Sequence, residues 1–133
     1  MNGNDRNRQF AAVVLSGDRS SSDPLVAASG RGCKALVDID GTPMILRVLD
    51  ALGQSATVGA ITICGPSRES IATEPRLERL IAEQRIGWQA PQATPSTSAW
   101  QALAATASGT PVLLTTADHP LLRADIIDHF CRE

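Results

Sequence analysis

Two segments of this sequence carry groups suited to binding phosphate. Residues 16–33 are rich in glycine, serine and aspartate and lead into Lys34, the only lysine among 133 residues. Glycines let backbone N–H groups approach an anion and a lysine adds a point charge, so this loop and its lysine could cradle a polyphosphate. Asp118 follows an apolar run that ends in two threonines. A carboxylate there is suited to hold Mg²⁺, a hard cation that shares its oxygen ligands with phosphate.

Each motif also has a purely structural interpretation. The loop lacks GxGxxG, and GRGCKA does not match the P-loop pattern GxxxxGK[ST], so a flexible surface loop with a solvated lysine stays open. Asp118 could instead cap the turn or helix that follows it. We expect no catalytic thiol at Cys33, because nothing in the pattern suggests a paired histidine.

Apolar runs and helical patterns alternate along the chain and must position these residues. Continuous apolar runs predict buried strands at residues 10–15, 58–64 and 111–116. A shorter strand is expected at residues 86–89, around Trp88. Apolar residues at helical spacing predict helices at residues 42–52, 74–84, 96–108 and 124–131. Residues 34–39 are expected to be extended, with a turn at Asp40 and Gly41. This alternation is typical of right-handed βαβ units, a parallel sheet and helices on both of its faces.

Four details of the helices follow from residue type. Thr42 is expected to cap a helix with Pro43 at its first position, and Gly53 to end it. Trp100 and Leu103, three residues apart, are expected to lie in the core. Asp125 and Asp128, on the last helix, are expected to be surface charges.

Composition narrows the class of protein. The net charge of −2 and the 20% of charged residues argue against a nucleic-acid binder. No apolar run is long enough to span a membrane, and the polar N-terminal segment has no signal-peptide core, so we expect a cytoplasmic protein. Three widely spaced cysteines (Cys33, Cys64 and Cys131) favour neither a disulfide framework nor a CxxC metal site. Residues 1–8 read as a disordered tail, and residues 9–133 as one domain.

The order of the motifs resembles the MobA-like NTP transferase family, nucleotidyltransferases with a GT-A-type, Rossmann-like fold. The resemblance rests on a strand running into LSGDR, on KALVDIDGTPMILRVL and on LLTTADHPLL, and it extends from about residue 10 to the end. It implies an α/β three-layer sandwich with a mainly parallel sheet that lacks the C-terminal part of the family domain.

The resemblance also implies a reaction and its site. An NTP would bind with Mg²⁺, and its nucleotidyl group would pass to a small phosphorylated acceptor with release of pyrophosphate. Lys34 and Arg19 would act in catalysis, and Asp118 would hold the metal. The residues that would contact the nucleotide are Leu15, Ser16, Gly17, Asp18, Arg19, Lys34, Ser96 and Thr97.

Two departures from the family pattern keep other functions open. Asp18 replaces the second glycine of the family's glycine pair, and its charge would repel a triphosphate unless it turns away or helps to hold the metal. The acceptor half of the family site is also missing. A nucleotide-binding or regulatory module without catalysis, or a degenerate interaction domain, is therefore the alternative. Finally, the strand at 111–116 would form an open sheet edge, which predicts self-association.

Overall fold

A four-stranded parallel sheet forms the centre of the computed structural model. The structure describes residues 10–16, 34–90, 92, 95–106, 109–117 and 123–132, without the side chains of Lys34, Pro95, Phe130 and Arg132. The strand order is β5-β4-β1-β6, and every neighbouring pair is parallel. The strands are β1 (Phe10–Leu15), β4 (Val58–Cys64), β5 (Gly87–Gln89) and β6 (Val112–Thr116). The four predicted strands and their parallel arrangement are confirmed.

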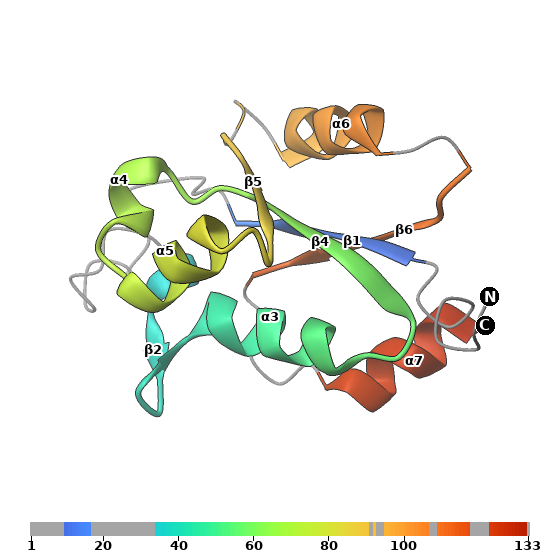
Figure 1. The fold of residues 1–133 in the computed structure, drawn as a ribbon, viewed down its shortest axis with the longest axis horizontal. Coiled ribbons are helices and arrows are strands. Elements are labelled where there is room, and N and C mark those ends of the chain that lie inside the picture. The colour runs from blue at the N-terminus through green and yellow to red at the C-terminus, as the bar shows by residue number, and fades with distance from the viewer. Residues whose placement is uncertain are drawn as a thin grey trace.

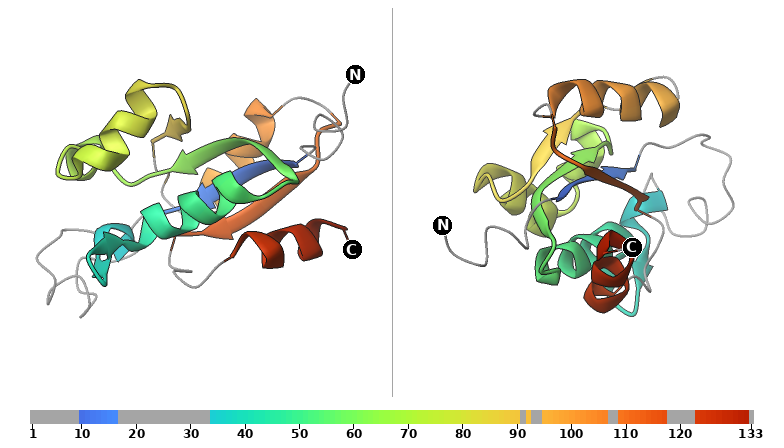
Figure 2. Two further views of the ribbon diagram at one scale, coloured as in Figure 1. Left: turned by 60° about the horizontal axis from the view of Figure 1, so that its bottom comes forward. Right: turned by 90° about the vertical axis from the view of Figure 1, so that its right-hand side faces the viewer.

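Helices cover both faces of the sheet, which makes three layers (Figures 1 and 2). One face carries α3 (Met44–Gln54), α5 (Pro75–Ala82) and α7 (Ala124–Arg132), and the other carries α6 (Pro95–Ala105). A short helix, α4 (Arg68–Ile71), follows β4 and was not expected. It begins where the Ser67 hydroxyl accepts a hydrogen bond from the Ser70 backbone N–H at 3.3 Å, which satisfies one of the free donors of its first turn.

The two faces of β1 serve two cores of unequal size. Successive side chains of a strand point to opposite faces, so Ala12 and Val14 join the large core under α3, α5 and α7. Val13 points the other way and joins a small core with Cys64 and Ala102, under α6. Because β1 is apolar on both faces, it suits the centre of a parallel sheet covered by helices.

The segment after Lys34 differs from its expected extended form. Residues Lys34–Leu36 form a 3-10 helix, η1, and only Asp38–Ile39 are extended, as β2. β2 pairs antiparallel with β3 (Thr42–Pro43), and the predicted turn at Asp40 and Gly41 joins them. The turn has φ of 52° and 82° at these two residues, as a type I′ hairpin turn requires.

Both predicted boundaries of α3 are wrong. Thr42 lies in β3 and does not cap the helix, which begins at Met44 with Pro43 before it and no side-chain cap. Gly53 lies inside the helix, which runs on to Gln54. The pairing of β2 with β3 holds Thr42 extended, which explains the later start. Local capping preferences were overridden by tertiary and sheet contacts.

Trp100 and Leu103 were expected in the core, and this prediction is wrong. Trp100 is 73% exposed and Leu103 is 44% exposed. The helix instead turns two small side chains, Ser98 and Ala102, to the sheet, where both are buried. These residues are one turn apart and lie on one face, so α6 approaches the sheet closely on that face and its large residues point outward.

Candidate functional site

The carboxyl ends of three strands lie level with one another at one edge of the sheet. Leu15, the last residue of β1, is in register with Cys64 of β4 and with Thr116 of β6. The connections reinforce this edge, because Ser16 N–H donates to Cys64 O and Ala117 N–H donates to Leu15 O, each at 3.0 Å. From β1 the chain proceeds to β4 on one side, and it later returns to β6 on the other side. Such a switch point is where open α/β sheets bind ligands.

Ser16, the first residue after β1, is a structural anchor of this edge. Its side chain is buried, and its hydroxyl donates to Gly65 O at 2.6 Å and lies 3.2 Å from Cys64 O. Both acceptors belong to the end of β4 and the turn after it. The hydroxyl therefore fixes where the loop after Ser16 begins. Leu15 packs its side chain against the small core under α6.

The first turn of α6 lies at the same edge and is tied to the ends of β4 and β5 (Figure 1). Ser96 and Thr97, predicted to contact the nucleotide, are exposed there. Ser98 is buried, and its hydroxyl accepts a hydrogen bond from the Gln92 backbone N–H at 3.0 Å. The Cys64 thiol lies 3.6 Å from the Gln89 side-chain oxygen and 3.9 Å from Ser98 O.

Ser98 and Cys64 were not among the residues predicted from the sequence. The thiol of Cys64 is buried, and burial raises its pKa, so the neutral thiol is favoured and a nucleophilic role is not supported. Ser98 could have been found from its spacing, because it lies four residues before Ala102 on the apolar face of the helix. Together the two residues position the exposed Ser96 and Thr97 without being available to a ligand themselves.

Lys34 begins η1, which contacts α3. The residues after it, Ala35, Leu36 and Val37, are buried, and Val37 O accepts a hydrogen bond from the Met44 backbone N–H at 3.0 Å. Burial of the three residues fixes the backbone of Lys34 relative to α3. The β2–β3 hairpin that follows lies at the same end of the molecule as the carboxyl ends of β1 and β4 (Figures 1 and 2).

Four predicted site residues lie outside the described part of the chain. They are Gly17, Asp18, Arg19 and Asp118. The described residues that flank them, Ser16 and Ala117, are held at the strand ends by backbone hydrogen bonds. Ser16 N–H donates to Cys64 O, and Ala117 N–H donates to Leu15 O. Among the described residues, no group of three or more His, Cys, Asp or Glu side chains could hold a metal ion. In the same residues, no helix is long and apolar enough to cross a membrane.

A solved structure of similar fold is that of CMP:2-keto-3-deoxy-manno-octonic acid synthetase in complex with CTP. The TM-score is 0.63 and the sequence identity is 17%. The match covers 92% of this chain and 46% of the synthetase chain, so the present chain spans about half of that protein's length. At this identity the likeness shows the fold alone, and it confirms the predicted Rossmann-like α/β architecture with a mainly parallel sheet.

No curated protein sequence matches the chain significantly. A family model does match, and it extends over residues 12–133, which is nearly the whole chain. The matched region contains the parallel sheet except for the first two residues of β1, together with the edge at Leu15 and the segments that resembled the family in the sequence. The chain therefore belongs to the family of the MobA-like NTP transferase domain.

Proposed function

We propose that the chain binds a nucleoside triphosphate at the sheet edge formed by β1, β4 and β6 and takes part in nucleotidyl transfer. The register of Leu15 with both Cys64 and Thr116 carries this proposal. It brings the loop that follows Ser16 and the segment that follows Ala117 to one edge, at the switch point where such sheets bind ligands. The family match and a relative of the same fold crystallised with CTP support a nucleotide as the ligand.

The proposed roles of the individual residues follow their chemistry. Leu15 and Ser16 would fix the start of the loop, backbone N–H groups from Gly17 to Arg19 would surround the phosphates, and Lys34 and Arg19 would neutralise the charge that develops during transfer. Asp118 follows directly after Ala117 and would supply an oxygen ligand to Mg²⁺. Bound Mg²⁺ would neutralise and orient the triphosphate. Ser96 and Thr97 are exposed beside the ends of β4 and β5 and would face the base.

The acceptor is proposed to be a small phosphorylated molecule that attacks the α-phosphate and releases pyrophosphate. Residues 9–133 would form the nucleotide-binding part of such a domain. The alternative is a nucleotide-binding or regulatory module without catalysis. Asp18 instead favours a degenerate interaction domain, because a carboxylate within this loop would oppose the binding of a triphosphate.

Thermal unfolding with and without ligand tests nucleotide binding directly. Each of the four common NTPs is added with and without Mg²⁺, and the midpoint of unfolding is measured. At a hundred times its Kd, a ligand adds about 2.7 kcal/mol of stability, so the expected shift is several degrees for at least one NTP in the presence of Mg²⁺. No shift with any NTP would rule out both the enzyme and the binding module.

The Lys34→Ala variant tests the phosphate role of the lysine. A charge-assisted contact contributes about 1.5–3 kcal/mol, so NTP affinity should fall at least roughly tenfold. Arg79→Ala, on the exposed surface of α5, is the matched control for loss of one positive charge. Equal affinities for the Lys34 and Arg79 variants would contradict the role proposed for Lys34. Production of pyrophosphate with a panel of phosphorylated acceptors separates the enzyme from the binding module.

We also propose that the chain associates with a second copy through β6, which is an edge strand of the described sheet. Its five residues, VLLTT, carry no charge that would discourage pairing. Leu114 is the middle residue, so antiparallel pairing about a twofold axis would place the two Leu114 side chains opposite each other. Five large apolar side chains are exposed among the described residues. Four of them lie on β6 (Leu114), on α6, which precedes β6 in the chain (Trp100 and Leu103), or on α7, which follows it (Ile126).

A further inference from the structure

A second candidate site lies beside β5, the edge strand on the side of the sheet away from β6. An open groove of about 650 Å³ is lined there by residues of β4, α5 and β5, by the turn that joins α5 to β5, and by Arg68 of α4. Its apolar surface comes from Ile61, Ile81 and Ile86, and Trp88 adds an indole ring. Two cations, Arg68 and Arg85, also line it. None of the lining residues belongs to the nucleotide site proposed above.

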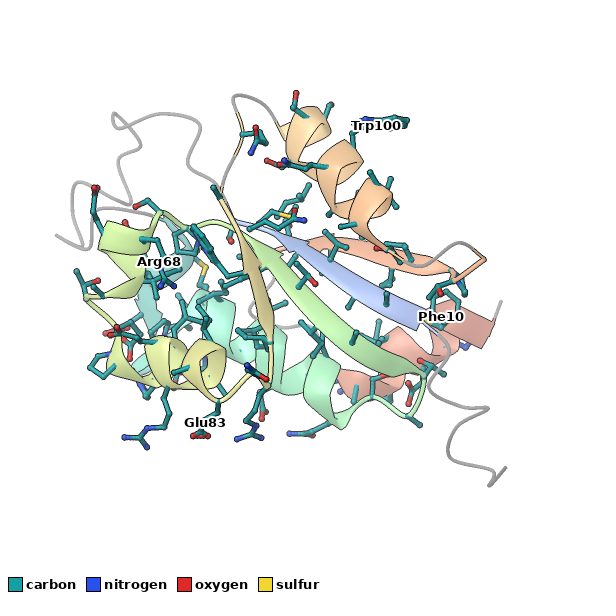
Figure 3. All side chains as sticks on the ribbon, turned by 45° about the horizontal axis from the view of Figure 1, so that its top comes forward. Phe10, Arg68, Glu83 and Trp100 are labelled. Atoms are coloured by element: carbon teal, nitrogen blue, oxygen red, sulfur yellow. The ribbon has the colours of Figure 1, made fainter. Side chains whose placement is uncertain are left out.

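The indole of Trp88 holds the Arg68 guanidinium in place. The guanidinium carbon lies 5.1 Å from the ring centroid, within the range of a cation–π contact. The ring is itself fixed, because the Trp88 indole N–H donates to Pro66 O at 2.9 Å. Stacking uses the flat face of a guanidinium and leaves the N–H groups around its rim available to an anion. Figure 3 shows the Arg68 side chain in the space between α4 and α5.

Among the residues that the structure describes, no carboxylate pairs with the two arginines. The residues that line the groove include no Asp or Glu, and no ion pair joins Arg68 or Arg85 to a carboxylate of the described residues. Other arginines of the chain do have such partners: Arg76 lies 2.8 Å from Glu74, and Arg123 lies 2.9 Å from Asp125. The labelled Glu83 projects from the end of α5 away from Arg68 (Figure 3). The positive charge of the groove is thus local, in a chain whose net charge is −2.

Gly87 keeps the groove open at the start of β5. A Cβ at this position would come within 3.3 Å of the Thr62 hydroxyl oxygen, so a side chain there would crowd β4. The ladder between β4 and β5 begins at Thr62 and Gly87, and the stretch of β4 before Thr62 has no strand partner on this side in the described residues. Ala60 and the half-buried Ile61, from this stretch, therefore line the groove.

We propose that this groove binds a small organic phosphate, with the phosphate on Arg68 and Arg85 and the apolar body on the three isoleucines. Guanidinium groups form paired, charge-assisted hydrogen bonds to phosphate oxygens. An apolar surface with a few placed charges is the usual lining of a small-molecule site. The site is separate from the sheet edge at Leu15, so it holds whether or not an NTP binds there.

The fluorescence of Trp88 reports occupancy in a Trp100→Phe background, where Trp88 is the only tryptophan. Benzyl phosphate is the probe, and benzyl alcohol and phenylacetate are its uncharged and carboxylate counterparts. The expected result is a saturable change with benzyl phosphate and at least tenfold weaker binding of both counterparts. Equal binding of benzyl alcohol would overturn the role of the arginines, and equal binding of phenylacetate would overturn the choice of phosphate.

Charge-removing variants locate the probe on the surface. Arg68→Gln and Arg85→Gln should each weaken benzyl phosphate at least fivefold, whereas Arg79→Gln, an exposed arginine of α5 outside the groove, should leave its affinity unchanged. Circular dichroism checks that each variant is folded. The titration is then repeated with a saturating NTP and Mg²⁺. An unchanged affinity is expected, and competition, or equal effects of all three variants, would overturn the proposal.

Discussion

Asp128 of α7 accepts hydrogen bonds from both the hydroxyl and the backbone N–H of Thr57, at 2.9 and 3.3 Å. The Ser55 hydroxyl also donates to the same carboxylate. Ser55 and Thr57 are buried in the turn between α3 and β4, so one side chain near the end of the described chain fastens a turn that lies more than seventy residues earlier. Asp128 is therefore a structural tie, and the expectation that it is merely a surface charge is wrong.

Replacing Asp128 should destabilise the fold. In Asp128→Ala the donors at Ser55 and Thr57 lose a charged acceptor, and we expect the free energy of unfolding to fall by about 1–3 kcal/mol. Asp125→Ala is the matched control, because Asp125 is exposed and pairs with the exposed Arg123. Such surface pairs contribute about 0–1 kcal/mol. Urea unfolding measures both variants, and equal losses of unfolding free energy would contradict a structural role for the hydrogen bonds of Asp128.

The contribution of Asp128 should also depend on pH. Hydrogen bonds from Ser55, and then from Thr57 and the Ala56 backbone, hold the pKa of Asp128 below its ordinary value. A lowered pKa in the folded state means stabilisation that is complete above the unfolded-state pKa, about 3.9, and that is lost as pH falls through the folded-state pKa. The difference in unfolding free energy between wild type and Asp128→Ala should be constant near neutral pH and shrink below about pH 4. A constant difference down to pH values near 2 would refute this explanation.

Two glycines should respond in opposite ways to the same substitution. Gly41 has φ of 82° in the β2–β3 turn, so Gly41→Ala should cost about 1–2 kcal/mol because an L side chain strains that conformation. Gly53 lies inside α3 with nothing within 4 Å of a Cβ placed on it. Gly53→Ala should therefore raise stability by about 0.5–1 kcal/mol. Chemical unfolding of the two variants provides the test, and destabilisation by Gly53→Ala would place Gly53 back at a helix end.

The two tryptophans should contribute very differently to stability. Trp88→Phe removes the donor to Pro66 O, a carbonyl of a buried proline, and should lower the free energy of unfolding by about 1–3 kcal/mol. Trp100 is largely exposed on α6, on the side of the helix away from β5 (Figure 3). Trp100→Phe should change stability by less than about 0.5 kcal/mol. Guanidinium unfolding followed by circular dichroism measures both, and a larger loss for Trp100 would contradict the exposed position.

A charge on β6 should prevent the proposed self-association. Light scattering of the wild type should show a mass that rises toward a dimer with concentration. Leu114→Lys should stay monomeric, because a lysine on an edge strand discourages pairing between chains. Ile39→Lys, in the β2–β3 hairpin, adds the same charge at another exposed apolar position and should associate as the wild type does. A monomeric wild type, or an associating Leu114→Lys, would refute pairing through β6.

The strands and the family could be predicted from the sequence because their signals are local. FAAVVL at 10–15 is apolar without interruption, and VGAITIC at 58–64 is interrupted only by Gly59 and Thr62. Short apolar runs bounded by turn signals are typical of strands buried on both faces. The motifs around Lys34 and before Asp118 likewise depend on residue order alone, and the family match over residues 12–133 confirms the resemblance they carry. The turn at Asp40 and Gly41 was predictable because few residues tolerate positive φ.

Tertiary structure decided what depends on contacts between distant segments. Thr42 has the chemistry of a helix cap, but pairing with Ile39 draws it into a strand. Trp100 has the chemistry of a core residue, but α6 turns Ser98 and Ala102 to the sheet, and Trp100 stays exposed. Asp128 lies in a sequence pattern typical of a surface charge, but the hydroxyls of Ser55 and Thr57, from the turn before β4, donate hydrogen bonds to its carboxylate. The sequence thus determined the strands, the family and the candidate chemistry, whereas which side chains are buried or bonded followed from packing between elements far apart in the chain.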